Sequence, residues 1–174
     1  MSRRRFLRDV RGVAAVEFAL MAPMLILACF GSFEVFQAAA AYRKLCSTTV
    51  ELATVTSQYT TMSANDVSNV MNATSQIMTP FATQNLSIVL SEISTNSLNH
   101  ATVTWSQAYN GGSALTPGAS VTLPSSLSQS STSYILVQTT YAWSPLVTGT
   151  IGSIQMTDQI YSLPRQSGSI SYTG

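Results

Sequence analysis

The feature that most constrains this chain is an apolar segment close to its N-terminus. Residues 13–36 carry no polar side chain except Glu17, Ser32 and Glu34. As a helix, the charge-free stretch 18–33 would span about 24 Å, less than the ~30 Å hydrocarbon core of a bilayer. A helix that starts at Val13 spans roughly 31 Å and is long enough. The segment therefore predicts one membrane-spanning helix that includes Glu17 or holds it at the membrane edge.

Within this span, the apolar positions expected to meet lipid or neighbouring helices are Leu20, Pro23, Leu25, Leu27, Phe30 and Phe33. Pro23 removes one backbone hydrogen bond, to Ala19, which transmembrane helices tolerate. A carboxylate costs about 2–3 kcal/mol at the centre of a span and less near its edge. We therefore expect Glu17 to have a function or a partner.

Basic residues are concentrated before the apolar segment. Five of the eight lysines and arginines precede residue 12, at Arg3, Arg4, Arg5, Arg8 and Arg11. A basic patch that ends at an apolar run is a topology signal more often than a nucleic-acid site. It predicts a cytoplasmic N-terminus, a single pass through the inner (cytoplasmic) membrane and a periplasmic remainder, with no nucleic-acid partner.

The remainder is polar without being ionic. Charged residues make up 9% of the chain, against about a quarter in soluble globular proteins, and Ser, Thr, Gln and Asn supply the polarity after residue 56. Such a surface fits a secreted or envelope protein. Cys29 and Cys46 would lie about 25 Å apart on one helix, too far for a disulfide within the chain. Pairing of Cys46 between subunits stays open.

Residues 11–25 read RGVAAVEFALMAPML. The glycine, the spaced Glu-Phe pair and the apolar run together resemble the N-terminus of TadE-like proteins, the pseudopilins of tight-adherence (Flp-type) pilus systems. The resemblance implies a basic prepilin leader that ends at Gly12, and a prepilin peptidase that cuts between Gly12 and Val13. Glu17 would then be the fifth residue of the mature chain, where type IV pilin-like proteins keep a glutamate.

The resemblance also implies roles and partners. Glu17, with Phe18 beside it, would register neighbouring subunits, because the cut creates an ammonium at Val13 with which Glu17 of a neighbour can pair. The implied partners are prepilin peptidase, other Tad pilins and pseudopilins, inner-membrane platform proteins and the lipid bilayer. Whether the subunit is TadE-type or TadF-type, and whether it enters the pilus, stays open.

Three other interpretations of the N-terminus stay open. Residues 2–8 look like a twin-arginine export signal. Residues 38–40 supply an A-x-A site for signal peptidase, although Glu17 and Glu34 would interrupt such a leader. The helix could also be an anchor that is never cut. The alternatives to a minor pilin or pseudopilin are therefore a membrane-tethered periplasmic binding or adaptor module, or a secreted β-rich protein.

The predicted organisation has three parts: a leader (1–12), a transmembrane and extended helix (13–57), and an extracytoplasmic domain (58–174). A stripe at helical spacing is expected to pack on that domain or on neighbouring helices; it consists of Tyr42, Leu45, Leu52, Val55 and Tyr59. Hydroxyl-rich residues 57–63 break the helix. Ser63, Asn65 or Asp66 can cap a second helix over 65–78.

From Asn85 the sequence period shifts toward two, which indicates strands. The predicted strands cover 86–90, 102–109, 120–123, 134–141 and 154–163. In the second of them, Val103, Trp105, Gln107 and Tyr109 are expected on one face. Two helices followed by four or five strands predict an α+β fold, with a small antiparallel sheet packed on the long helix.

No pattern of catalytic chemistry is present in the sequence. His100 is the only histidine, the acids after residue 36 are scattered, and there is no Gly-rich phosphate loop or metal-ligand cluster. We therefore expect no enzyme activity, no cofactor, no metal site and no small-molecule substrate. The expected role is structural, in assembly of a Tad adhesive pilus.

Overall fold

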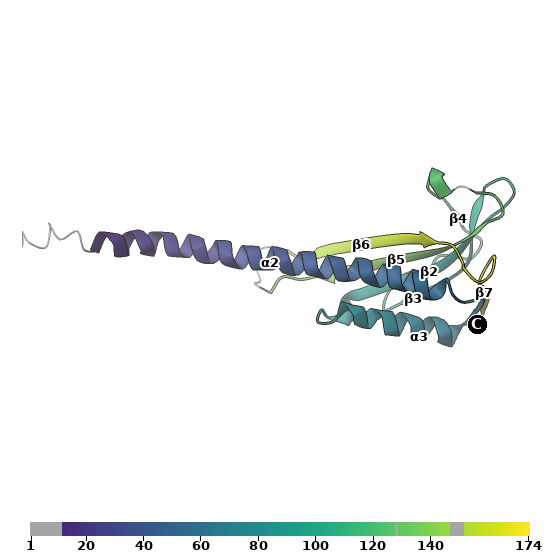
Figure 1. Ribbon diagram of the computed structural model, residues 1–174, viewed down its shortest axis with the longest axis horizontal. Coiled ribbons are helices and arrows are strands. Elements are labelled where there is room, and N and C mark those ends of the chain that lie inside the picture. The colour runs from purple at the N-terminus through teal and green to yellow at the C-terminus, as the bar shows by residue number, and fades with distance from the viewer. Residues whose placement is uncertain (1–11, 128, 147–151) are drawn as a thin grey trace, which may run out of the picture. The chain divides into compact units, whose positions relative to one another are not determined.

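The structure, a computed structural model, describes residues 12–127, 129–146 and 152–174. The predicted leader up to residue 11, with its arginines, lies outside the described residues. A long helix, a short helix and an antiparallel sheet follow one another along the chain, as Figure 1 shows. The predicted α+β class is confirmed. The chain forms two units, of which the second comprises Ala40–Ser144 and Ser153–Gly174.

Helix α2 runs from Val13 to Thr56, in agreement with the helix predicted over 13–57. Pro23 lies inside it without ending it. The helix ends at a hydroxyl-rich segment whose first residue bonds back to the last turn. The Ser57 N–H donates to the Ala53 carbonyl at 3.0 Å, and the Ser57 hydroxyl donates to the Thr54 carbonyl at 2.7 Å.

The C-terminal part of α2, from Ala40 onward, buries one face within the second unit. The fully buried positions recur every three to four residues and include Ala41, Leu45, Thr48, Thr49, Leu52 and Thr56. Leu45 and Leu52 of the predicted stripe are buried within this unit, whereas Tyr42 is 45% exposed and does not pack on the domain. Ala41, one position earlier, takes the buried place, because the small side chain allows close approach of the helix.

Threonines contribute to this face because their hydroxyls are satisfied locally. Thr48 and Thr49 donate to the carbonyls four residues earlier, each at 2.9 Å. Thr49 also shares a hydrogen bond of 2.7 Å with Thr139 of strand β5 (Ser133–Trp143). This buried contact joins α2 to the sheet, as predicted.

Helix α3 (Ala64–Ser75) is followed by a 3-10 turn, η2 (Gln76–Met78), and together they match the helix predicted over 65–78. Ser63 is the N-cap. Its hydroxyl accepts from the Asp66 N–H at 3.2 Å while the Asp66 carboxylate accepts from the Ser63 N–H at 2.9 Å. This reciprocal capping box explains why the helix begins where it does.

The main sheet has five antiparallel strands in the order β4-β3-β2-β5-β6. Besides β5, its members are β2 (Leu86–Thr95), β3 (Ala101–Tyr109), β4 (Ser120–Val121) and β6 (Ile154–Ser162). All five were predicted, but β2 is five residues longer than expected and β4 two residues shorter. Isoleucine, valine, threonine and aromatic side chains favour these strands.

The face predicted for β3 is correct for Trp105, Gln107 and Tyr109 but wrong for Val103, because the pairing of β2 with β3 contains a register shift after Glu92. Trp105 pairs with Glu92, whereas Val103 pairs with Ile93. Successive residues of a strand point to opposite faces, so Val103 and Trp105 do not share a face. The shift skips Thr104 and reverses the alternation of β3. A β-bulge of this kind cannot be seen in the period of one strand.

The sequence pattern does not predict a second, two-stranded sheet. Strand β1 (Thr61–Ser63) pairs in parallel with β7 (Ser171–Thr173), close to the end of the chain. Two further backbone bonds align the same segments: Arg165 N–H donates to the Ser57 carbonyl at 2.8 Å, and Ser171 N–H to the Thr60 carbonyl at 3.1 Å. Part of the predicted breaker at 57–63 is therefore a strand.

The packing of α2 on the sheet can be tested at Leu52, which is fully buried. Leu52→Ala is expected to lower the free energy of unfolding by about 2–5 kcal/mol, because it leaves a cavity beside the buried face of the helix. The full chain in detergent micelles would be unfolded with urea and followed by tryptophan fluorescence, since Trp105 and Trp143 are both buried.

The control is Val50→Ala on the same helix, where the side chain is 48% exposed. A change within about 0.5 kcal/mol is expected there. Equal losses for the two variants would contradict the assignment of the buried face.

Candidate functional site on the N-terminal helix

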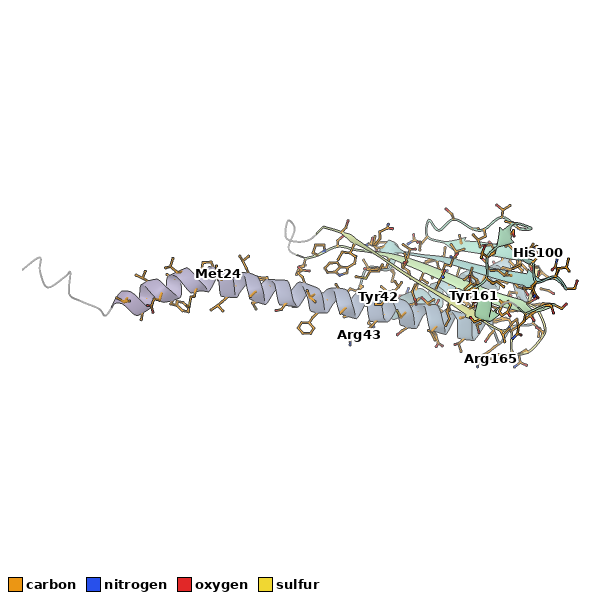
Figure 2. All side chains as sticks on the ribbon, turned by 90° about the horizontal axis from the view of Figure 1, so that it is seen from above. Met24, Tyr42, Arg43, His100, Tyr161 and Arg165 are labelled. Carbon is orange, nitrogen blue, oxygen red and sulfur yellow. The ribbon has the colours of Figure 1, made fainter. Side chains whose placement is uncertain are left out.

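The N-terminal part of α2 is apolar and exposed around its whole circumference. Between residues 12 and 33 every side chain is exposed except Ala22, which is half-buried. Large apolar side chains dominate, with Leu20 and Met24 about three-quarters exposed at 73% and 75%. Figure 2 shows side chains that project from both borders of the ribbon around Met24. Such a surface requires lipid or apolar partner helices around it.

Helix α2 is long and apolar enough to cross a membrane. All the apolar positions predicted for the span lie in this helix, and Leu25, Leu27, Phe30 and Phe33 are exposed along it. Its two internal irregularities are accommodated without ending it. Pro23 interrupts one backbone bond, and the Ser32 hydroxyl donates to the Cys29 carbonyl at 2.8 Å, so the serine brings no unsatisfied donor into the span.

Gly12 and Val13 stand at the first turn of this helix. Gly12 immediately precedes α2, and no heavy atom lies within 4 Å of where a side chain would start at Gly12. Val13 is half-exposed at 50%. In the single chain the bond between these residues is therefore open to a second protein. Its cleavage stays a prediction.

Glu17 lies one helical turn after Val13 and is exposed among apolar neighbours. Phe18, beside it, is 68% exposed. The first basic residue that follows Glu17 on α2 is Arg43, about 39 Å further along the helix. A cation on the same helix could therefore approach Glu17 only from the N-terminal side. A new ammonium at Val13 would lie there, one turn away.

Glu34, which interrupts the apolar run in the sequence, is 1% exposed. It is the one buried side chain of α2 before Ala41, although Phe33 and Val35 on either side are exposed. The sequence does not predict burial of a glutamate between two apolar residues of a membrane-spanning segment. The structure alone identifies it.

The residues that carry this geometry match a known family. Residues 12–53 match the family model of TadE-like proteins. The resemblance inferred from residues 11–25 is thereby confirmed for this segment, which is about a quarter of the chain. The matched TadE-like segment begins at Gly12, includes Glu17 and ends close to the end of α2, before the sheet. The match indicates a Tad pilus-associated protein.

No curated protein and no solved structure matches the chain. The TadE-like match therefore supports the helix and its first residues, whereas the sheet is interpreted from its own contacts.

No group of three or more potential metal ligands occurs among the residues that the structure describes. His100 is exposed in the turn between β2 and β3, where its backbone N–H donates to the Asn96 side-chain oxygen at 2.9 Å. This bond belongs to the backbone of the turn and gives the imidazole no role.

The most unusual titratable group of the sheet is Glu92, which is 1% exposed. Its carboxylate accepts from the Ile170 N–H at 2.9 Å, and the Trp105 indole N–H donates to the Ile170 carbonyl at 2.8 Å. Trp105 also stacks on Tyr172 with ring centroids 5.4 Å apart. Burial raises the pKa of the Glu92 carboxyl, against the opposing effect of its hydrogen bonds. These contacts hold the C-terminal tail, which is a structural role.

The raised pKa of Glu92 predicts a pH-dependent stability. The Glu92 carboxyl binds a proton more readily in the folded state than in the unfolded state. Its contribution to the free energy of unfolding is therefore fully present below the ordinary pKa of 4.5. It is lost as the pH rises through the raised pKa. Thermal unfolding of the full chain in micelles is expected at a lower temperature as the pH increases across this window.

Glu92→Gln should remove that slope, because the amide oxygen can still accept from Ile170 and carries no charge to desolvate. Glu51→Gln, at an exposed acid of α2, should keep the wild-type slope. A wild-type slope in the Glu92 variant would refute the assignment.

Proposed function

We propose that the protein is a minor pilin or pseudopilin that acts structurally in assembly of a Tad (Flp-type) adhesive pilus. In this proposal a prepilin peptidase cuts between Gly12 and Val13, Glu17 with Phe18 registers neighbouring subunits, and the apolar helix packs first in lipid and then against other pilins. The protein is a single-pass inner-membrane protein with a cytoplasmic N-terminus and a periplasmic domain over 58–174.

The observation that carries this proposal is the exposed apolar part of α2, residues 13–33, with one acid near its start, inside the segment that matches the TadE-like family. A helix that served only as a lipid anchor would gain nothing from an acid among its apolar residues, because a carboxylate is costly there. A helix that must also align with copies of itself benefits from one polar contact at a defined depth.

Electrostatics supports the pairing of Glu17 with an ammonium at Val13. Within one chain the two groups are separated by one helical turn, about 6 Å of rise. A stagger of one turn between adjacent helices would bring Glu17 of one subunit level with Val13 of the next. The pair would be more favourable than the lone carboxylate. In a medium of low dielectric constant an unpaired charge is costly, whereas the attraction between opposite charges is strong.

Processing can be tested by mass spectrometry of the mature protein from its native host. The wild-type chain is expected to begin at Val13. Gly12→Leu is expected to keep its leader, because a side chain at this position obstructs the approach of the peptidase to the backbone. Gly31→Leu, at an exposed position further along the span, is the matched control and should be processed normally.

A mature chain that begins near Ala41 would contradict the proposal and identify a secreted protein. An intact leader on the wild-type chain would identify a tethered domain.

Registration can be tested with Glu17→Ala. We expect membrane insertion and protein amount to be unchanged, and surface pili to decrease about tenfold or more, since loss of one buried ion pair per subunit contact exceeds 1.4 kcal/mol. Insertion would be measured in membrane fractions, and pili by electron microscopy and shear release.

Glu51→Ala, at an exposed acid further along α2, is the control and should assemble normally. Normal pilus numbers in the Glu17 variant would favour the tethered adaptor instead.

A further inference from the structure

We propose that strand β6 is a docking site for an extended strand of another protein that carries a basic residue at its centre. This inference rests on the sheet and is independent of the N-terminal helix.

Strand β6 is a long open edge. It is the last strand in the sheet order, and its nine residues pair with β5 without a register shift. Figure 1 shows it along the outer border of the sheet. Alternate residues of an antiparallel edge strand direct their N–H and C=O groups away from the sheet. No backbone hydrogen bond from outside the sheet reaches β6 among the described residues.

The two edges of the sheet differ in a way that favours β6. Strand β4, at the other edge, has only two residues and is followed closely by Pro124. Natural edges are blocked by short strands, lysine, proline or bulges. Strand β6 is nine residues long and has no lysine, proline or bulge. Its one protective device is the charge of Asp158, which opposes an uncharged or acidic strand more than a basic one.

Each face of β6 would present different chemistry to an added strand. On one face, Thr157 and Gln159 are exposed, and they border an open hollow of about 530 Å³ whose lining also includes Asp158 and, from β5, Gln138, Thr139 and Thr140. This face is uncharged and offers hydroxyl and amide groups. On the other face, Met156, Asp158 and Ile160 are partly exposed, and Asp158 interacts with Cys46 of α2.

The charge of Asp158 determines which added strand would bind favourably to β6. Asp158 is the only charged residue of β6 and lies at its centre. Opposite charges across a strand pair are favourable, and like charges are unfavourable. None of the strands β1–β7 contains lysine or arginine, so no strand of a second copy could supply the cation. In the centred antiparallel pairing of β6 with itself, Asp158 would face Asp158. The complementary partner is therefore a different protein.

The test uses nine-residue peptides of alternating threonine and valine, labelled with a fluorophore, and the full chain in detergent micelles. The peptides carry lysine or glutamate at the centre. Fluorescence anisotropy is expected to show about fivefold tighter binding of the lysine peptide. Hydrogen exchange should show new protection of the amides of residues 154–162 and none in β4. A lysine peptide with N-methyl groups on alternate residues should bind at least about tenfold more weakly.

Asp158→Asn should remove the preference between the lysine and glutamate peptides without loss of the fold, and Glu51→Gln should retain it. Equal binding of the two peptides by the wild-type chain, or protection away from β6, would overturn the proposal. Protection of β6 in the peptide-free chain that increases with protein concentration would also overturn it, because a second copy would then be the occupant.

Discussion

The packing of α2 on the five-stranded sheet is the contact on which the rest of the second unit depends. Ala41, Leu45 and Leu52 are fully buried along one face of α2, and Thr49 on the same face hydrogen-bonds Thr139 of β5. Apolar burial supplies the free energy, while the threonine pair sets the position of the helix along β5. The same helix also contains the apolar N-terminal segment. One helix therefore contributes both to a packed core and to an exposed apolar surface.

The C-terminal tail depends on a second contact, centred on a buried carboxyl. Glu92 and Trp105 both bond to the backbone of Ile170, and Tyr172 stacks on Trp105. The tail then pairs with β1, which follows α2 directly. The end of the chain therefore closes onto the end of the long helix. A buried acid in this position is costly unless its hydrogen bonds are made, which makes the tail a defined part of the fold.

Local patterns predicted those parts of the fold that local forces control. Helix α2 follows from a long run rich in Ala, Leu and Met that continues through Pro23 and Gly31, and α3 begins after Ser63 because Ser63 and Asp66 are spaced for a capping box. The bulge after Glu92, the pairing of β1 with β7 and the exposure of Tyr42 were missed or predicted wrongly. Each of the three depends on residues far apart in the chain or on the size of a neighbouring side chain. None of them produces a periodic pattern within one segment of the sequence.

The sequence by itself determined the apolar helix, the isolated acid at Glu17 and the TadE-like segment, because hydropathy and spacing along one helix are properties of consecutive residues. Only the tertiary structure decided which strand of the sheet is left open. That choice depends on strand order, which arises from contacts between distant segments and leaves β6 at the border with Asp158 at its centre. Only the folded chain also brings Glu92 to Ile170, since 78 residues separate them in sequence.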